Sequence, residues 1–327
     1  MAQSPVLAVD DLRTSFHTRA GVVRAVDGVS FRIERGRILG LVGESGSGKT
    51  VTGFSIMRLV DPPGRIDGGR ILFGGRDLVG LSEAEMRQLR GSRLAMIFQD
   101  PMMTLNPVLR IDTQMIEAVL AHHPELGRDE ARRRSRDALG RVGIPSPEER
   151  LAAYPHQFSG GMRQRVAIAI AFLNRPDLII ADEPTTALDV TIQGQILYEV
   201  QKLCRESGTA LLWITHDLSV VAALADEVCV MYAGKIVEQG AVDDILDRPA
   251  HPYTYGLLRS VASANMRGQK LYQIPGMTPS LLRLPQGCSF RLRCGRASPA
   301  CFAAPGMTML DPGRFVRCVH PLVEIEA

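Results

Sequence analysis

The sequence predicts an α/β protein in which short apolar strands alternate with helices and a helical region is inserted between them. Short apolar runs such as Ile38–Val42 and Leu178–Ala181 lead directly into glycines or acidic residues, as buried strands of a parallel sheet do. Residues 104–175 instead show helical spacing and a dense Arg/Asp/Glu face. After about residue 250 the periodicity ends and Pro, Gly, Arg and Cys become frequent, which indicates a separate, loop-rich part.

The individual elements are expected where apolar runs or helical spacing are bounded by turn residues. Strands are predicted at Val22–Ile33, Ile38–Val42, Ile71–Phe73, Leu94–Phe98, Leu178–Ala181, Ala210–Thr215 and Val228–Tyr232. Helices are predicted at Thr50–Leu59, Ile111–Leu120, Arg128–Val142, Met162–Leu173, Thr191–Glu206 and Leu218–Ala225.

The length of 327 residues exceeds one comfortable core, so we expect a large domain and a smaller appendage. The large domain covers residues 1–250, with the helical subdomain at about 104–175. The extension covers residues 251–327 and contains a cysteine module at about 285–325. A hydrophobic fraction of 45% and a net charge of +3 describe an ordinary globular protein and give no electrostatic argument for nucleic acid binding.

No stretch approaches the roughly 18 consecutive apolar residues of a membrane span. The most apolar run, Val166–Leu173, is far shorter, and the N-terminus has no basic region followed by an apolar stretch. We therefore expect a cytoplasmic protein whose membrane role, if it has one, comes through partners. In that compartment cysteines are more often metal ligands or buried hydrophobes than disulfides.

A glycine-rich loop between a predicted strand and a predicted helix matches the pattern G-x-x-x-x-G-K-[ST] of phosphate-binding loops. Its residues are Gly43, Glu44, Ser45, Gly46, Ser47, Gly48, Lys49 and Thr50. Glycines permit a tight loop whose backbone N–H groups converge on phosphate oxygens. Lys49 would reach the terminal phosphates and Thr50 would offer its hydroxyl to Mg²⁺, so the loop predicts a nucleoside triphosphate site.

An acidic pair ends the buried strand at Leu178–Ala181. Asp182 is placed to hold Mg²⁺, and Glu183 to polarise a water molecule for attack on the γ-phosphate. An acidic pair alone is also compatible with a sheet edge or a helix cap, but together with the phosphate-binding loop it indicates ATP hydrolysis.

The segment Phe158-Ser-Gly-Gly-Met-Arg-Gln-Arg165 is similar to the signature sequence of the ABC ATPases, and it precedes the strand ending at Asp182 as in that family. Gln99 before this segment, and Asp189 and His216 after it, also occur in family order, so the resemblance covers residues 6 to about 245. It implies a P-loop NTPase cassette with a RecA-like core, an antiparallel β-subdomain and an inserted α-helical subdomain. Met162 departs from the commonest signature, which has Gln there.

The resemblance also implies a role for each matched position. Glu183, His216 and Gln99 would be catalytic, with Gln99 joining Thr50 and Asp182 around Mg²⁺. Three signature residues, Ser159, Gly160 and Gly161, would bind the ATP held by the opposite subunit, so that two chains enclose two nucleotides. Asp189 would be the D-loop residue, and Phe16 the aromatic that stacks on adenine, with Phe31 as the competing aromatic.

Finer features resemble the dipeptide/oligopeptide/nickel importer subfamily: the segment Phe98–Pro107, the segment Tyr154–Gln157 and the segment His251–Thr254. This implies a peptide-import motor at the cytoplasmic face of the inner membrane. Its partners would be a second ATPase subunit, for which the resemblance favours a paralogue, two membrane permease subunits and an extracytoplasmic substrate-binding protein. Nickel chelates and glutathione remain alternative substrates. A soluble ABC ATPase acting on nucleic acid or ribosomes is the alternative from another class.

The C-terminal module contains four cysteines in the spacing C-x5-C-x6-C-x16-C, namely Cys288, Cys294, Cys301 and Cys318. Because no C-x-x-C pair is present, the spacing leaves zinc, an iron–sulfur cluster and no metal open. Resemblance to the extension of peptide-importer ATPases favours a [4Fe–4S] cluster, with Zn²⁺ as the alternative. The neighbouring Arg291, Arg293 and Arg296 are expected to lower the thiol pKa values.

Overall fold

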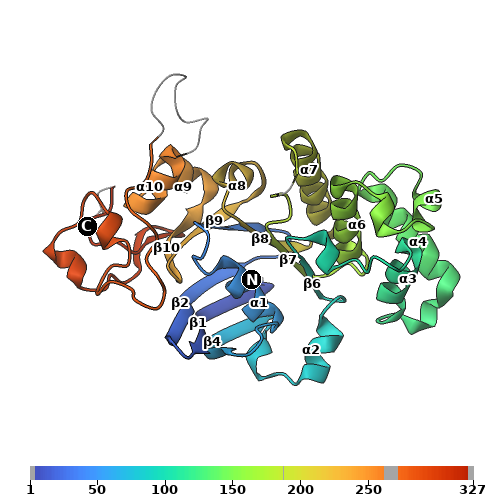
Figure 1. Cartoon of the computed structure of the whole chain (residues 1–327), viewed down its shortest axis with the longest axis horizontal. Helices are drawn as coiled ribbons and strands as arrows, with labels where there is room; N and C mark the ends of the chain where they lie inside the picture. The colour runs from blue at the N-terminus through green and yellow to red at the C-terminus, as the bar shows by residue number, and fades with distance from the viewer. Residues whose placement is uncertain (1–3, 187, 261–271, 323–327) are drawn as a thin grey trace. The chain divides into compact units, whose positions relative to one another are not determined.

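The computed structural model describes residues 4–186, 188–260 and 272–322 (Figure 1). The chain divides into two compact units. The first unit comprises residues 1–7, 33–37 and 80–213. The second comprises residues 8–32, 38–79 and 214–327, so it holds both the glycine-rich loop and the C-terminal extension. In the described part of the chain, no helix combines the length and the apolar character needed to cross a membrane.

The first unit contains a parallel strand pair. β6 (Leu94–Ile97) pairs with β7 (Leu178–Asp182) in the register Leu94 to Leu178, and β8 (Ala210–Thr215) follows on the other side of β7. All residues of the three strands are buried, which explains their continuous apolar sequences. Asp177, just before β7, accepts from the Arg35 and Arg93 side chains at 2.8 and 2.7 Å and fixes where the strand begins.

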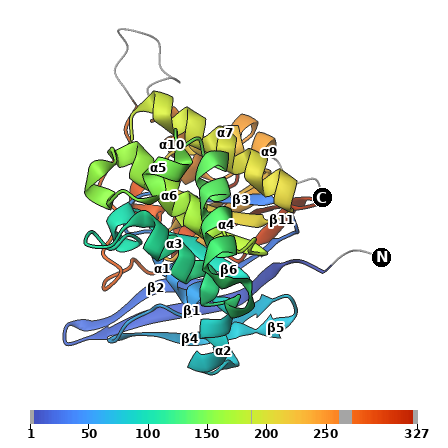
Figure 2. The same ribbon diagram turned by 90° about the vertical axis from the view of Figure 1, so that its right-hand side faces the viewer.

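Helices make up the rest of the first unit: α2 (Glu83–Leu89), α3 (Ile111–Leu120), α4 (Gly127–Arg141), α5 (Pro147–Leu151), α6 (Gly160–Phe172) and α7 (Val190–Ser207). Figure 2 shows α3 to α6 gathered side by side. The buried residues Ile111, Met115 and Val119 of α3 recur every four positions, as expected for one apolar helix face. The predicted helix Met162–Leu173 begins two residues earlier than expected, so the paired glycines of the signature belong to α6.

The second unit contains one sheet of order β2-β1-β4-β5, formed by β1 (Leu7–Thr18), β2 (Gly21–Ile33), β4 (Gly64–Phe73) and β5 (Arg76–Asp77). The predicted strand Ile71–Phe73 is thus the end of a longer strand. Helix α1 (Lys49–Met57) packs near this sheet, because the buried hydroxyls of Thr14 and Ser55 lie 2.8 Å apart.

A further set of strands in the second unit has the order β11-β12-β10-β9-β3. It consists of β3 (Ile38–Val42), β9 (Glu227–Tyr232), β10 (Lys235–Ala241), β11 (Thr308–Asp311) and β12 (Arg314–Val316). β3 and β9 are parallel, whereas β10 pairs antiparallel with β9 and with β12. The C-terminal residues therefore extend the strand set that carries the glycine-rich loop, a connection that the sequence pattern does not reveal.

The same unit includes three short helices: α8 (Leu218–Leu224), α9 (Val242–Asp247) and α10 (Pro252–Arg259). Its apolar core joins β3 and β9 to the extension. Tyr253 of α10 and Phe290 of the cysteine module lie in one buried cluster with Val42, Val230 and Tyr232. The extension and the strands of this unit thus share a continuous core.

Candidate functional site

The glycine-rich loop connects β3 to α1, and its glycines are required by its backbone. Gly43, Gly46 and Gly48 have φ values of 156°, 76° and 106°, a region that disfavours residues with a side chain. A Cβ atom on Gly43 would lie 2.1 Å from the carbonyl oxygen of Met231, and one on Gly48 would lie 2.1 Å from that of Ala25. The loop is therefore compatible only with glycine at these two closely packed positions.

Lys49 is buried at the start of α1, with 4% of its surface exposed. Its ammonium donates to the carbonyl oxygens of Gly43 at 2.9 Å and Glu44 at 3.1 Å, so it lies across the loop. Thr50 follows, exposed, in the first turn of α1, a turn that has no acidic residue. The N-terminal end of α1 therefore combines a cation, a hydroxyl and helix N–H groups with no carboxylate in the same turn, and this combination suits a phosphate.

Two more predicted residues belong to the second unit. Phe16 is half-buried in β1, where a Cβ atom on Gly64 would meet its ring at 2.7 Å, so the ring packs on that glycine. Phe31, its competitor for adenine, is only 5% exposed and lies in the core, where a base has no access to its ring. His216 is exposed immediately after β8.

The acidic pair lies at the end of β7 in the first unit. Asp182 is the last residue of the strand and is 4% exposed, while Glu183 is half-buried. Glu183 has a φ of 45°, unusual for a residue with a side chain, and its Oε2 accepts from the Thr186 hydroxyl at 3.0 Å. Backbone outliers of this kind concentrate at functional sites, where the surrounding structure holds a side chain in a required direction.

The other predicted residues of the first unit occupy exposed ends of elements. Gln99 is exposed just after β6. Ser159 caps α6 by accepting from the N–H of Met162 at 3.3 Å, and Gly160 and Gly161 form its first turn, which has no acidic residue. Asp189 caps α7 by accepting from the N–H of Ile192 at 2.9 Å. Each therefore presents polar groups at the start of a helix or the end of a strand.

Residues of the C-terminal extension contact the loop at Glu44, and the sequence pattern does not indicate these contacts. The Glu44 carboxylate forms an ion pair with Arg293 at 2.7 Å, and the Glu44 N–H donates to the Tyr253 hydroxyl at 2.8 Å. The only signal in the sequence was the segment His251–Thr254, which contains Tyr253. Nothing in the spacing of Arg293, 249 residues after Glu44, indicates this contact.

The four cysteines of the module line one small cavity of about 10 Å³, together with His251 and His320. The Cys288 N–H donates to the Cys301 carbonyl oxygen at 2.9 Å. The sulfurs of Cys294 and Cys318 accept from the N–H groups of Arg296 and His320 at 3.4 and 3.3 Å. Four thiols around one cavity, with backbone donors to two sulfurs, match the donor chemistry of a thiolate-bound metal or cluster.

The geometry of these thiols does not reach that of a metal site. Within residues 4–186, 188–260 and 272–322, no group of three or more His, Cys, Asp or Glu side chains is arranged to hold a metal ion. Two of the three arginines act on the thiols in the expected direction: the N–H and the charge of Arg296 lower the pKa of Cys294, and the N–H of Arg291 lowers that of Cys288, but burial outweighs both. Burial raises the pKa of Cys288 and Cys294, and raises that of Cys318 to about 11. Arg293 pairs with Glu44 instead, and Arg291 lies over the Phe302 ring.

Comparison with known proteins gives two family matches. Residues 26–186 match the ABC transporter family, and residues 237–301 match the oligopeptide/dipeptide transporter C-terminal region. The oligopeptide transport ATP-binding protein OppD of Escherichia coli is 48% identical over 320 residues, covering 98% of this chain and 94% of that protein. The dipeptide transport ATP-binding protein DppD of Bacillus subtilis is 49% identical over 315 residues, covering 96% of this chain and 94% of that protein.

Solved structures agree at the level of the fold. The structure of CbiO1 from Clostridium perfringens, part of the ABC transporter complex CbiONQ, has a TM-score of 0.64 at 27% identity and covers 75% of this chain and 92% of that one. The structure of a dimeric bacterial ABC transporter cassette has a TM-score of 0.66 at 24% identity and covers 72% of this chain and 98% of that one. With its P-loop NTPase fold and its C-terminal region, the chain belongs to the ABC transporter ATP-binding proteins of the oligopeptide/dipeptide type.

Proposed function

We propose that this chain is the ATP-hydrolysing subunit that energises peptide import through an ABC transporter. The observation that carries the proposal is the combination of the phosphate-binding loop with a C-terminal region of the oligopeptide/dipeptide type in one chain. The names of its relatives, which are oligopeptide and dipeptide transport ATP-binding proteins, support the substrate class.

In this proposal the loop residues Gly43–Thr50 bind the phosphates of ATP, with Lys49 neutralising charge on the terminal phosphates. Thr50, Asp182 and Gln99 would hold Mg²⁺, which would offset the negative charge of the phosphates. The half-buried carboxylate of Glu183 orients the attacking water and accepts its proton. His216 contacts the γ-phosphate, and Phe16 stacks on adenine.

The signature at the start of α6 acts on the ATP of a second subunit. Ser159, Gly160 and Gly161 offer helix N–H groups to the γ-phosphate, and the first turn of α6 carries no carboxylate to oppose it. Asp189 lies at the start of α7 as the D-loop residue. ATP then favours the closed pair of subunits and hydrolysis releases it, a ligand-driven equilibrium between two states.

The partners we propose are a second ABC ATPase subunit, a paralogue of this chain, two membrane permease subunits and an extracytoplasmic substrate-binding protein. The chain would then lie at the cytoplasmic face of the inner membrane through these partners.

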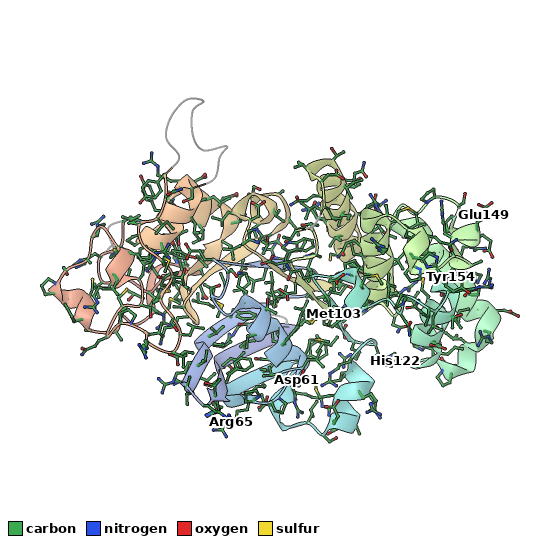
Figure 3. The ribbon with its side chains drawn as sticks, in the orientation of Figure 1. Asp61, Arg65, Met103, His122, Glu149 and Tyr154 are labelled. Carbon is green, nitrogen blue, oxygen red and sulfur yellow. The ribbon has the colours of Figure 1, made fainter. Side chains whose placement is uncertain are left out.

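One residue of the segment Phe98–Pro107 suits a surface that contacts such a partner. Met103 is 70% exposed in this segment and is labelled, like Tyr154, in Figure 3. An exposed methionine suits a surface that adapts to a partner.

We also propose that Cys288, Cys294, Cys301 and Cys318 hold a [4Fe–4S] cluster, with Zn²⁺ as the alternative. Support comes from the shared cavity and the N–H groups directed at two sulfurs. Binding would require the thiols to lose their protons and close around the metal. Iron and sulfide analysis after anaerobic purification tests this: about four of each per chain supports the cluster, whereas zinc without sulfide contradicts it.

The experiment that tests the function is purification of the full chain with its bound partners from detergent-extracted membranes. The proposal expects permease subunits in the complex and ATP hydrolysis that a peptide-loaded binding protein stimulates. Recovery of nucleic acid or ribosomes without membrane subunits would contradict it and favour the soluble ABC class. Stimulation by nickel chelates or glutathione, but not by peptides, would retain the motor and replace the substrate.

A further inference from the structure

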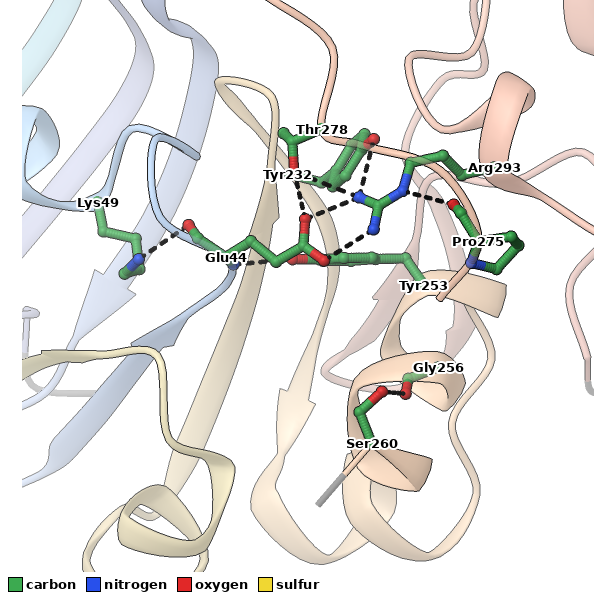
Figure 4. A network of polar contacts seen from close by, with 9 residues as sticks. All are labelled: Glu44, Lys49, Tyr232, Tyr253, Gly256, Ser260, Pro275, Thr278 and Arg293. Atoms are coloured by element: carbon green, nitrogen blue, oxygen red, sulfur yellow. Dashed lines mark hydrogen bonds and ion pairs between the residues drawn. The ribbon is translucent and has the colours of Figure 1, made fainter. Parts of the chain in front are cut away.

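The C-terminal extension contacts the phosphate-binding loop at Glu44, through Tyr253, Thr278 and Arg293. Figure 4 shows the Glu44 carbonyl oxygen facing Lys49 while the Glu44 carboxylate faces Arg293. The hydroxyl of Tyr253 accepts from the Glu44 N–H on the same side as Arg293. The backbone and the side chain of one loop residue are thus both bound by residues of the extension.

The contact to Arg293 has the geometry of a strong ion pair. The two guanidinium nitrogens Nη1 and Nη2 lie 2.7 and 3.0 Å from the two Glu44 carboxylate oxygens, and the Thr278 hydroxyl donates to Oε2 at 2.5 Å. Arg293 is 7% exposed, and its Nε donates to the Pro275 carbonyl oxygen at 3.0 Å. A guanidinium held at both ends and bonded bidentately fixes the direction of the carboxylate.

The contact to Tyr253 is fixed by the cap of α10. The buried carboxylate of Glu238 accepts from the N–H groups of Ala250 and His251 at 2.6 and 2.8 Å. His251 Nδ1 in turn accepts from the Tyr253 N–H at 3.0 Å. Tyr253 is fully buried, and its ring lies 4.6 Å from that of Tyr232. This chain of contacts gives the segment His251–Thr254 a physical role, which is to place the tyrosine hydroxyl at the loop.

Glu44 connects these contacts to the nucleotide site because its carbonyl oxygen is one of the two loop oxygens that Lys49 contacts. The Glu44 N–H that Tyr253 holds lies in the same planar peptide group as the Gly43 carbonyl oxygen, the other oxygen that Lys49 contacts, so a rotation of that peptide would move the loop backbone beside Lys49. We propose that Tyr253 and Arg293 are positioning residues of the C-terminal extension that hold the phosphate-binding loop in its nucleotide-binding conformation through Glu44. The inference rests on the proposed function, since it assigns these residues to the same ATP site.

The test compares binding of a non-hydrolysable ATP analogue by full-chain variants, together with KM and kcat for ATP. Arg293→Ala removes both hydrogen bonds of the ion pair with Glu44 and is expected to weaken nucleotide affinity about tenfold. Tyr253→Phe removes one hydroxyl group and is expected to weaken nucleotide affinity about fivefold. Both variants raise KM for ATP with kcat changed less than about twofold, because neither residue touches the reacting atoms. Arg293→Lys keeps the charge without the bidentate geometry and recovers part of the affinity.

The matched control is Arg283→Ala, which removes an exposed arginine of the same extension and is expected to bind as the wild type. Unfolding midpoints of the variants, measured without nucleotide, distinguish an effect on the loop from a general loss of stability. If Arg293→Ala and Tyr253→Phe lower the midpoint but bind nucleotide with wild-type affinity, the contacts are structural only and the inference is overturned. Lys49→Ala distinguishes a failure of this inference from a failure of the proposed function, because wild-type nucleotide affinity in that variant would refute the proposed nucleotide site itself.

Discussion

Removal of the Glu238 side chain on β10 should destabilise the C-terminal extension. The Glu238 carboxylate is fully buried, accepts from the N–H groups of Ala250 and His251, and lies 3.6 Å from the guanidinium of Arg314, which is itself 2% exposed. Glu238→Ala leaves two buried N–H groups without their acceptor and removes the buried carboxylate beside Arg314, whose guanidinium keeps only the half-exposed Asp311 at 3.7 Å and the Arg248 carbonyl oxygen. Breaking such a buried pair costs about 3–5 kcal/mol, a large share of the stability of a domain.

Urea unfolding of the full chain, followed by circular dichroism, measures this loss. Glu238→Gln keeps one acceptor oxygen and is expected to lose less than Glu238→Ala, while Glu206→Ala, which removes an exposed carboxylate of α7, is expected to change little. A loss below about 1 kcal/mol for Glu238→Ala would show that these contacts are not stabilising and would refute the reasoning.

Three further predictions concern the ATP site. Glu183→Gln should retain ATP binding and lower hydrolysis by about 100-fold or more, because the amide cannot accept the proton of water; near-normal turnover would remove Glu183 from this role. Gly48→Ala should abolish nucleotide binding, because its Cβ would lie 2.1 Å from the Ala25 carbonyl oxygen, whereas Gly194→Ala in open space on α7 should bind normally. Burial alone would raise the pKa of Glu44, but hydrogen bonds from Arg293 and Thr278 outweigh it and lower the pKa. The difference in free energy of unfolding between the wild type and Glu44→Gln should therefore have its full size above about pH 4.5 and vanish as the pH falls through the lowered pKa of Glu44. A difference that persists at low pH in urea unfolding would contradict this.

Much of the fold was predictable because the relevant signals are local. The strands Ile38–Val42 and Ala210–Thr215 and the helix Ile111–Leu120 have the predicted bounds, since buried strands and amphipathic helices have apolar residues at characteristic spacing. The loop Gly43–Thr50 was predictable for the same reason, because its glycines meet steric demands within a few residues of chain.

Contacts between distant segments were not predictable from these signals. The pairing of β12 with β10 joins residues about 80 positions apart. β12 has only three residues, and one of its two buried residues is Arg314, so its sequence shows no apolar alternation. Arg293 was assigned to the neighbouring cysteines because it is close to them in sequence. In the structure its guanidinium instead reaches Glu44, a partner that only the tertiary fold identifies.

The central claim, that ATP hydrolysis by this chain energises peptide import, is tested most directly by peptide uptake into proteoliposomes that contain the purified complex. With ATP on the side of this subunit and peptide-loaded binding protein on the other, the account predicts uptake that requires ATP and is lost with Lys49→Ala. Uptake that continues with Lys49→Ala, or ATP hydrolysis with no movement of peptide, would contradict it.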